Sequence, residues 1–123
     1  MVRGIRGAIT VPANESDLME KATKRLLDEM IEQNQIDPET VCSAFLSATS
    51  DLDAMFPAKV LREQDGWAFV PVMCMQELAI KGSLERCIRI MMHVNTNVAQ
   101  KDIQHVYLEG AAVLRPDLQQ STN

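Results

Sequence analysis

One long amphipathic segment among several strand-like segments is the feature that most constrains the fold of this chain. Between residues 16 and 34, apolar side chains recur every three to four positions, which predicts a helix with one apolar face. The apolar positions are Leu18, Ala22, Leu26, Leu27, Met30 and Ile31. Asn14 or Ser16 is expected to cap the start of this helix, and Asn34 to take the left-handed conformation at its end. Because one helix covers only one face of a sheet, a second face would have to be covered by something else.

β-branched and alternating segments on both sides of this helix predict the strands. We expect five of them, at residues 2–11, 41–49, 67–75, 85–94 and 106–114. Short helical turns are expected at Asp37 and Pro38, from Pro57 to Arg62, and within residues 98–104. The sequence therefore predicts an α+β fold, with a mixed sheet of about five strands, one long helix and short helices.

The segment 85–94 alternates cleanly and so predicts which side of the sheet is the core. One face carries Ile88, Ile90, Met92 and Val94, which we expect to be buried. The other face carries Cys87, Arg89, Met91 and His93, joined on a neighbouring strand by Tyr107. Such a set of semi-polar residues is not typical of a face that contacts only solvent, so it predicts association with other copies of the chain.

Length and charge limit the possible partners. With 123 residues the chain is expected to form a single domain, 1–123, with residues of about 116–123 as a mobile polar tail. Residues 15–39 hold eight acidic against three basic side chains and account for the net charge of −5. The pI of about 4.9 and the lack of a Lys and Arg run argue against nucleic acid as a partner. Six of the seven arginines lie outside that acidic region, which suits a local site for a small anion.

Several classes of protein receive no support from the motifs. The N-terminus lacks a secretory signal, and the longest apolar stretch, residues 69–75, is too short to span a membrane, so no membrane partner is expected. Three cysteines without C-x-x-C spacing predict neither disulfides nor a zinc site and favour a reducing cytoplasm. His93 and His105 are isolated, so no metal is assigned. Phosphate loops, nucleophile elbows and paired-carboxylate motifs are also absent, which leaves arginines and one acid that could bind a small polyanion.

Arg89 is the first candidate site residue. It lies in the middle of a predicted strand between apolar residues, where an unpaired guanidinium would cost several kcal/mol. It should therefore meet a carboxylate, either of a ligand or of the protein. The structural alternative is an ordinary ion pair with Glu77 or Glu109.

Four further candidates each have a structural alternative. Arg6 lies between two glycines that would let a ligand approach the backbone, or it is a solvated strand arginine. Glu77 follows an apolar strand and is a site acid or a surface acid at a turn. Tyr107 is a ligand contact or an edge residue whose hydroxyl lies in water. Cys74 has no neighbouring histidine in the sequence and is more typical of a small buried apolar residue than of a nucleophile.

In several segments the sequence resembles a known family, the monofunctional AroH-class chorismate mutases, over nearly its whole length. The segments are 3–8, 46–49, 51–52, 56–59, 70–72, 74–77, 87–89, 105–109 and 114–118. The resemblance implies a homotrimer whose sheets surround a barrel-like core, with an active site in each cleft between subunits. It also implies an isomerase that converts chorismate to prephenate by an intramolecular Claisen rearrangement, on the route to phenylalanine and tyrosine, with no cofactor and no metal.

The resemblance also implies roles for individual residues. Arg89 would contact the ether oxygen and the side-chain carboxylate, Arg6 and Tyr107 the enolpyruvyl carboxylate, and Glu77 with the backbone or side chain of Cys74 the ring hydroxyl. Arg62 would attract or cover the ring carboxylate. The pocket would be lined by Phe56, Ala58, Lys59, Val72, Met73, Leu114 and Arg115. The rival hypothesis is a non-catalytic module that senses a carboxylate or an amino acid at a subunit interface.

Overall fold

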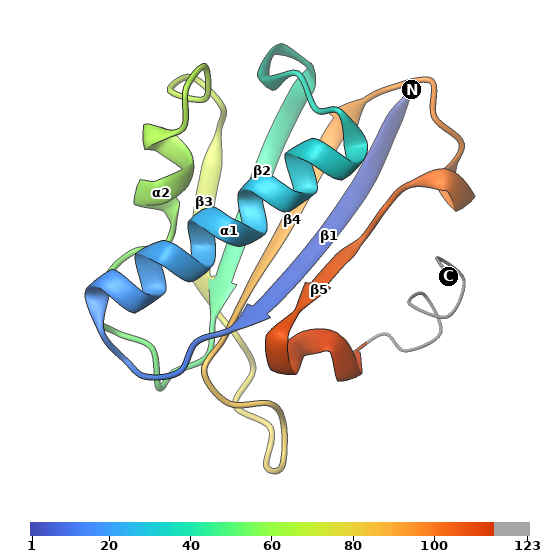
Figure 1. Ribbon diagram of the computed structural model, residues 1–123. Coiled ribbons are helices and arrows are strands. Elements are labelled where there is room, and N and C mark those ends of the chain that lie inside the picture. Colours follow the sequence, from blue (N-terminus) through green and yellow to red (C-terminus); the bar gives the residue numbers. More distant parts are fainter. Residues whose placement is uncertain (115–123) are drawn as a thin grey trace.

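The computed structural model describes residues 1–114 and confirms the predicted mixed sheet of five strands (Figure 1). The strands are β1 (Val2–Thr10), β2 (Val41–Ala48), β3 (Val72–Gln76), β4 (Cys87–Asn95) and β5 (Val106–Leu108). They lie in the order β3-β2-β4-β1-β5. The central strand β4 runs antiparallel to both β1 and β2, whereas the edge strands β5 and β3 run parallel to β1 and β2 respectively. The chain therefore crosses over between strands instead of forming simple hairpins.

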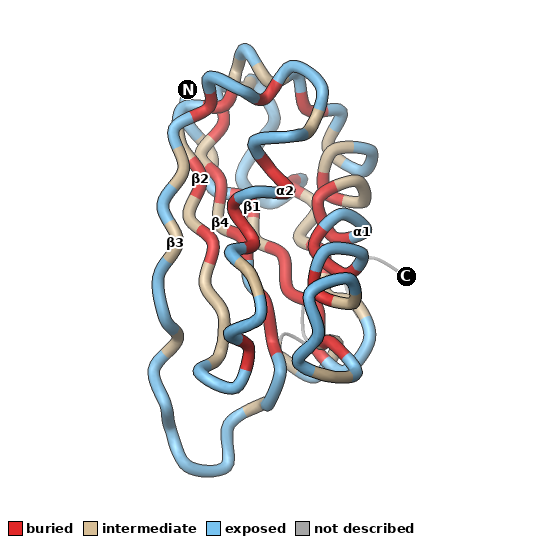
Figure 2. Tube along the Cα trace, turned by 90° about the vertical axis from the view of Figure 1, so that its left-hand side faces the viewer, coloured by how far each residue is buried: buried red, intermediate tan, exposed pale blue. Residues whose placement is uncertain are grey.

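Both α-helices lie on one face of this sheet, as Figures 1 and 2 show. The long helix α1 (Ser16–Asn34) packs against β1, and the short helix α2 (Ala58–Glu63) contacts α1. The buried residues of α1 are Met19, Ala22, Thr23, Leu26, Leu27 and Met30. Leu18 and Ile31, both expected in the core, are only partly buried, because the buried stripe is centred nearer Met19 and Thr23. Burial of Thr23 leaves no polar group unpaired, since its hydroxyl donates to the Met19 carbonyl at 2.7 Å.

The predicted caps of α1 are wrong, because both asparagines make tertiary contacts instead. No side chain within residues 1–114 caps the start of the helix. The Asn14 amide group instead donates to the Asp53 carboxylate at 2.6 Å and accepts the Asp53 backbone N–H at 3.0 Å. At the other end Gln35, with φ of 50°, takes the left-handed conformation. Asn34 donates to the Gln104 carbonyl and accepts the Gln104 N–H, and so ties the helix to the segment before β5.

Two strands are much shorter than predicted, and the other three are each one residue shorter. β3 begins at Val72 and not at Trp67, because Trp67 leaves the strand and fills the core with 1% of its surface exposed. Pro71, which has no N–H to donate, stands just before the strand, and its carbonyl accepts the Ala44 N–H at 2.9 Å.

The last predicted strand ends at Leu108. A 3₁₀ helix, η3 (Glu109–Leu114), follows, and the chain turns there because Glu109 has φ of 53°. The Gly110 N–H then donates to the Thr10 hydroxyl at 2.9 Å, which fixes η3 against the end of β1.

The short helical turns occur where they were predicted. They are α2 and the 3₁₀ helices η1 (Pro38–Thr40) and η2 (Gln100–Asp102). Asp37 caps η1 by accepting the Glu39 N–H at 3.0 Å, and Pro38 stands in its first turn, as expected.

The assignment of the two sheet faces is confirmed for β4. Ile88, Ile90, Met92 and Val94 are all buried against the helices. Among residues 1–114, no helix covers most of the opposite face of the sheet (Figure 2), and Met73 and Met75 of β3 are 62% and 47% exposed. One corner differs from expectation: Cys87 is buried beside Ala8 because Ala111 of η3 packs over them. Arg6, Arg89 and Tyr107, three of the predicted site residues, lie on this second face.

Candidate active site

A cavity of about 480 Å³ on the second sheet face brings together four of the five predicted catalytic residues. The predicted residues that line it are Arg6, Glu77, Arg89, Tyr107 and Leu114. Strand register explains the convergence, because Ala8 lies opposite both Arg89 and Tyr107, and Arg6 is two residues away on the same face. Residues distant in sequence thus meet on neighbouring strands.

Arg89 and Glu77 form an ion pair, as the structural alternative predicted. The distance between Arg89 Nε and Glu77 Oε1 is 3.5 Å, and the side chains are 46% and 24% exposed. Glu109, the other proposed partner, pairs instead with Arg25. An ion pair this exposed contributes little to stability. Because the Arg89 side chain is half exposed and lines the cavity, its guanidinium remains accessible to a ligand there.

Glu77 follows β3 and is held against β2 by two hydrogen bonds. Its backbone N–H donates to the Ala48 carbonyl at 3.0 Å, so the strand pairing of β3 with β2 extends to this residue. The Ser47 hydroxyl donates to Glu77 Oε1. Sequence reasoning did not identify Ser47 as a site residue. Strand alternation could have identified it, since it lies directly opposite Arg89 on the same face.

Arg6 is fixed through its backbone. Its N–H donates at 3.0 Å to Nδ1 of His105, in a partly buried contact just before β5. This geometry makes Nδ1 an acceptor and leaves any proton of the neutral ring on Nε2. His105, which the sequence analysis left without a role, therefore helps to place β1 beside β5.

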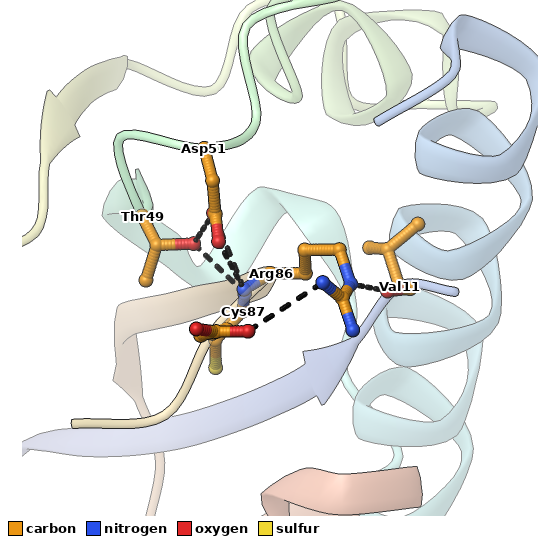
Figure 3. A network of polar contacts seen from close by, with 6 residues as sticks. Val11, Thr49, Asp51, Arg86 and Cys87 are labelled. Atoms are coloured by element: carbon orange, nitrogen blue, oxygen red, sulfur yellow. Dashed lines mark hydrogen bonds and ion pairs between the residues drawn. The ribbon is translucent and has the colours of Figure 1, made fainter. Parts of the chain in front are cut away.

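The start of β4 is fixed by a network of hydrogen bonds around Arg86, shown in Figure 3. Arg86 has φ of 47°, and both carboxylate oxygens of Asp51 accept its backbone N–H, at 3.0 and 3.2 Å. Its Nε donates to the Val11 carbonyl at 3.2 Å. The next residue, Cys87, donates its N–H to the Thr49 hydroxyl at 3.0 Å. These contacts join the ends of β1 and β2 to the strand that carries the site arginine.

The side chain of Cys74 does not line this cavity within one chain, so its contact with the ring hydroxyl stays a prediction. Cys74 pairs with Leu46, which is fully buried, and its side chain packs against the core. A side chain three positions before Glu77 in a strand points to the opposite face. Cys74 instead lines a second cavity of about 600 Å³, together with Phe56.

The predicted pocket-lining residues are mostly apart from Arg89 in a single chain. Four of them lie in or just before α2, on the helix-covered side: Phe56, Ala58, Lys59 and Arg62. Ala58 is buried, whereas Phe56 is 75% exposed. Val72 packs toward the core, and Met73 lies exposed at the sheet edge. Leu114 alone of this group lines the Arg89 cavity, and Arg115 lies outside the described residues.

Burial raises the pKa of the Cys87 thiol above its ordinary value, an effect that the nearby Arg89 partly opposes. Cys87 therefore stays a neutral thiol near pH 7 and is a poor nucleophile.

Within residues 1–114, no three His, Cys, Asp or Glu side chains gather in a way that could hold a metal ion. None of the helices described there has the length and apolar character needed to cross a membrane.

The fold and the site together define a class of protein: a small α+β chain with two arginines, one tyrosine and one carboxylate around a cavity on one sheet face. The chain belongs to the chorismate mutase type I family, whose model matches residues 2–118. As a member of this family it is an enzyme, an isomerase. The family resemblance noted in the sequence is confirmed.

Individual relatives agree over nearly the full length. Chorismate mutase AroH of Bacillus subtilis (strain 168) is 53% identical over 123 residues, which is 100% of this chain and 97% of that protein. Chorismate mutase AroH of Thermus thermophilus is 42% identical over 120 residues, covering 97% of this chain and 98% of that protein. A solved structure of a chorismate mutase from Clostridium thermocellum matches with a TM-score of 0.86 and 49% identity, covering 89% of this chain and 97% of that chain.

Proposed function

We propose that this chain converts chorismate to prephenate in the cavity around Arg89. The observation that carries the proposal is the convergence of Arg6, Arg89 and Tyr107, with Glu77, on one sheet face around about 480 Å³. Chorismate carries two carboxylates, an ether oxygen and a ring hydroxyl. Two guanidinium groups, a phenol and a carboxylate complement these groups in charge and in hydrogen bonding.

Each site residue takes one part of the substrate. Arg89 donates to the ether oxygen and to the side-chain carboxylate, and so stabilises the negative charge that grows on the oxygen as the carbon–oxygen bond breaks. Arg6 and Tyr107 hold the enolpyruvyl carboxylate and favour the compact conformer in which the new carbon–carbon bond forms. Glu77 accepts a hydrogen bond from the ring hydroxyl.

The reaction is unimolecular and needs no covalent intermediate, so positioning and electrostatics supply the catalysis. Holding the substrate in its reactive conformer removes an entropic part of the barrier. A fixed donor at the oxygen that gains charge contributes about 2.7–4 kcal/mol, judged from the loss of such donors elsewhere. Because the Arg89 side chain is only half exposed, its interaction with a bound anion is stronger than it would be in water.

A complete site requires a second copy of the chain. Phe56, Lys59 and Arg62 lie on the helix-covered side, away from the Arg89 cavity, and one chain cannot bring both groups to one ligand. A neighbouring subunit placed against the open sheet face supplies this second group, together with the backbone of Cys74. We propose a homotrimer with an active site in each cleft between subunits and a barrel-like core, working in the cytoplasm. Size-exclusion chromatography with light scattering tests the trimer directly.

Arg89→Ala tests the activity. Purified protein is mixed with chorismate, the fall in its ultraviolet absorbance is followed, and prephenate is confirmed by acid conversion to phenylpyruvate. We expect the unaltered protein to turn over without added metal or cofactor, and Arg89→Ala to fold and trimerise yet lose about 100-fold or more in kcat. Arg3→Ala is the matched control, because Arg3 is also a strand arginine but lies outside the cavity and donates to the Val98 carbonyl.

Substantial activity in Arg89→Ala would remove the role proposed for this residue. Tight binding of chorismate by a folded trimer without any turnover would instead favour a carboxylate- or amino-acid-sensing module. The two results are distinguished by measuring binding and turnover on the same preparation.

A further inference from the structure

The Glu77 carboxylate is held by Ser47 as well as by Arg89. Glu77 Oε1 accepts the Ser47 hydroxyl and lies 3.5 Å from Arg89 Nε. That second distance exceeds the 2.7–3.2 Å of an ordinary N–H···O hydrogen bond. The Nε–H of Arg89 therefore does not make a well-formed hydrogen bond to Glu77 Oε1.

Ser47 is rigidly placed for this contact. It lies in β2, between β3 and β4, directly opposite Arg89 on one side and Met75 on the other. Its side chain has a single torsion angle before the hydroxyl, and it lines the same cavity as Arg89. Since the Glu77 N–H is also bonded to the carbonyl of the next β2 residue, Ala48, both ends of Glu77 are anchored to β2.

We propose that Ser47 is a positioning residue that acts through Glu77 and keeps the carboxylate from closing onto Arg89. This inference rests on the proposed function, in which the Arg89 donors are needed by the substrate. Without the Ser47 hydroxyl, Glu77 would be free to form a two-bond pair with the guanidinium, the arrangement that carboxylates and arginines favour. That pair would neutralise the positive charge of Arg89, which stabilises the negative charge growing on the ether oxygen as the bond breaks.

A double-mutant cycle of Ser47→Ala and Glu77→Ala tests the inference. The free energy typically lost with a hydrogen bond to a charged group corresponds to about a tenfold fall in kcat/KM, which we expect for Ser47→Ala. We expect the loss mainly in kcat, because the charge on Arg89 matters most in the transition state. Ser47→Thr, which keeps the hydroxyl, should restore most of the activity. In the Glu77→Ala background, Ser47→Ala should have no further effect.

Ser43→Ala is the matched control. Ser43 lies in the same strand and on the same face, is also partly buried, and bonds to His93 outside the cavity. It should leave kcat/KM unchanged, even if the melting temperature falls slightly. If Glu77→Ala does not fold, Glu77→Gln takes its place in the cycle.

Three results would overturn the inference: no loss of kcat/KM in Ser47→Ala, a lowered melting temperature with unchanged kcat, or an equal loss in the Glu77→Ala background. The last result would mean that Ser47 contacts the substrate itself or acts elsewhere. Failure of the proposed function is a separate result, since the unaltered protein would then show no turnover of chorismate.

Discussion

Gly7→Ala should destabilise the protein by placing one methyl group into a gap that α1 already fills. A Cβ on Gly7 would lie 2.5 Å from Met30 Sδ and 3.0 Å from Leu26 Cδ1, and both of these side chains are fully buried. Overpacking of this kind costs about 1–3 kcal/mol. Alanine recovers roughly 0.5–1 kcal/mol over glycine in a strand. The middle of the two ranges gives a net loss in the free energy of unfolding of about 1 kcal/mol.

The effect should also reach the site, because Gly7 follows Arg6 and lines the Arg89 cavity. Urea denaturation followed by circular dichroism measures the stability, and the chorismate assay measures kcat. Gly4→Ala is the control: in the same strand its Cβ would meet only Met91 Sδ, at 3.5 Å, an ordinary contact. Equal stabilities for Gly7→Ala and the unaltered protein would refute the argument that α1 packs directly on this glycine.

Two further substitutions test local features of the fold. Gln35→Gly should raise the free energy of unfolding by up to about 1 kcal/mol, because the exposed Gln35 holds a left-handed φ of 50° that glycine adopts without strain; an unchanged melting temperature would contradict this. Burial raises the pKa of the Cys87 thiol in the folded protein above that of the unfolded chain. The stability that the neutral thiol contributes is therefore complete below the pKa of the unfolded thiol, and it is lost as the pH rises through the higher folded pKa. Stability should therefore fall at alkaline pH, and urea denaturation of Cys87→Ala across that range should show a smaller fall; an identical pH dependence would argue against it.

Local patterns were enough to predict the sheet, its core face and the long helix. The alternation of Ile88, Ile90 and Met92 depends only on the two-residue period of a strand, and their burial is confirmed. The ends of elements were less predictable, since they depend on distant partners. Asn34 could have ended α1 by local preference, but its side chain bonds Gln104, seventy positions away.

The site was predictable in its residue types but not in its division between two faces. Arg6, Glu77, Arg89 and Tyr107 were each singled out, and the pairing of the five strands brings them together. The family resemblance grouped Cys74 with Glu77, yet within one chain strand alternation places its thiol on the other side of the sheet. Ser47 was missed because a serine in a strand has no motif of its own.

The pairing of Arg89 with Glu77 shows why a structural interpretation and a functional one need not compete. A buried arginine requires a partner, which is why a structural ion pair was a reasonable expectation. At 46% exposure, however, Arg89 is not buried enough to need Glu77 for its solvation, and the 3.5 Å separation leaves the pair loosely formed. A partner at this distance balances positive charge on a sheet face that also carries Arg6. It still leaves guanidinium donors for a ligand, whose carboxylate and ether oxygen can approach more closely than Glu77 does.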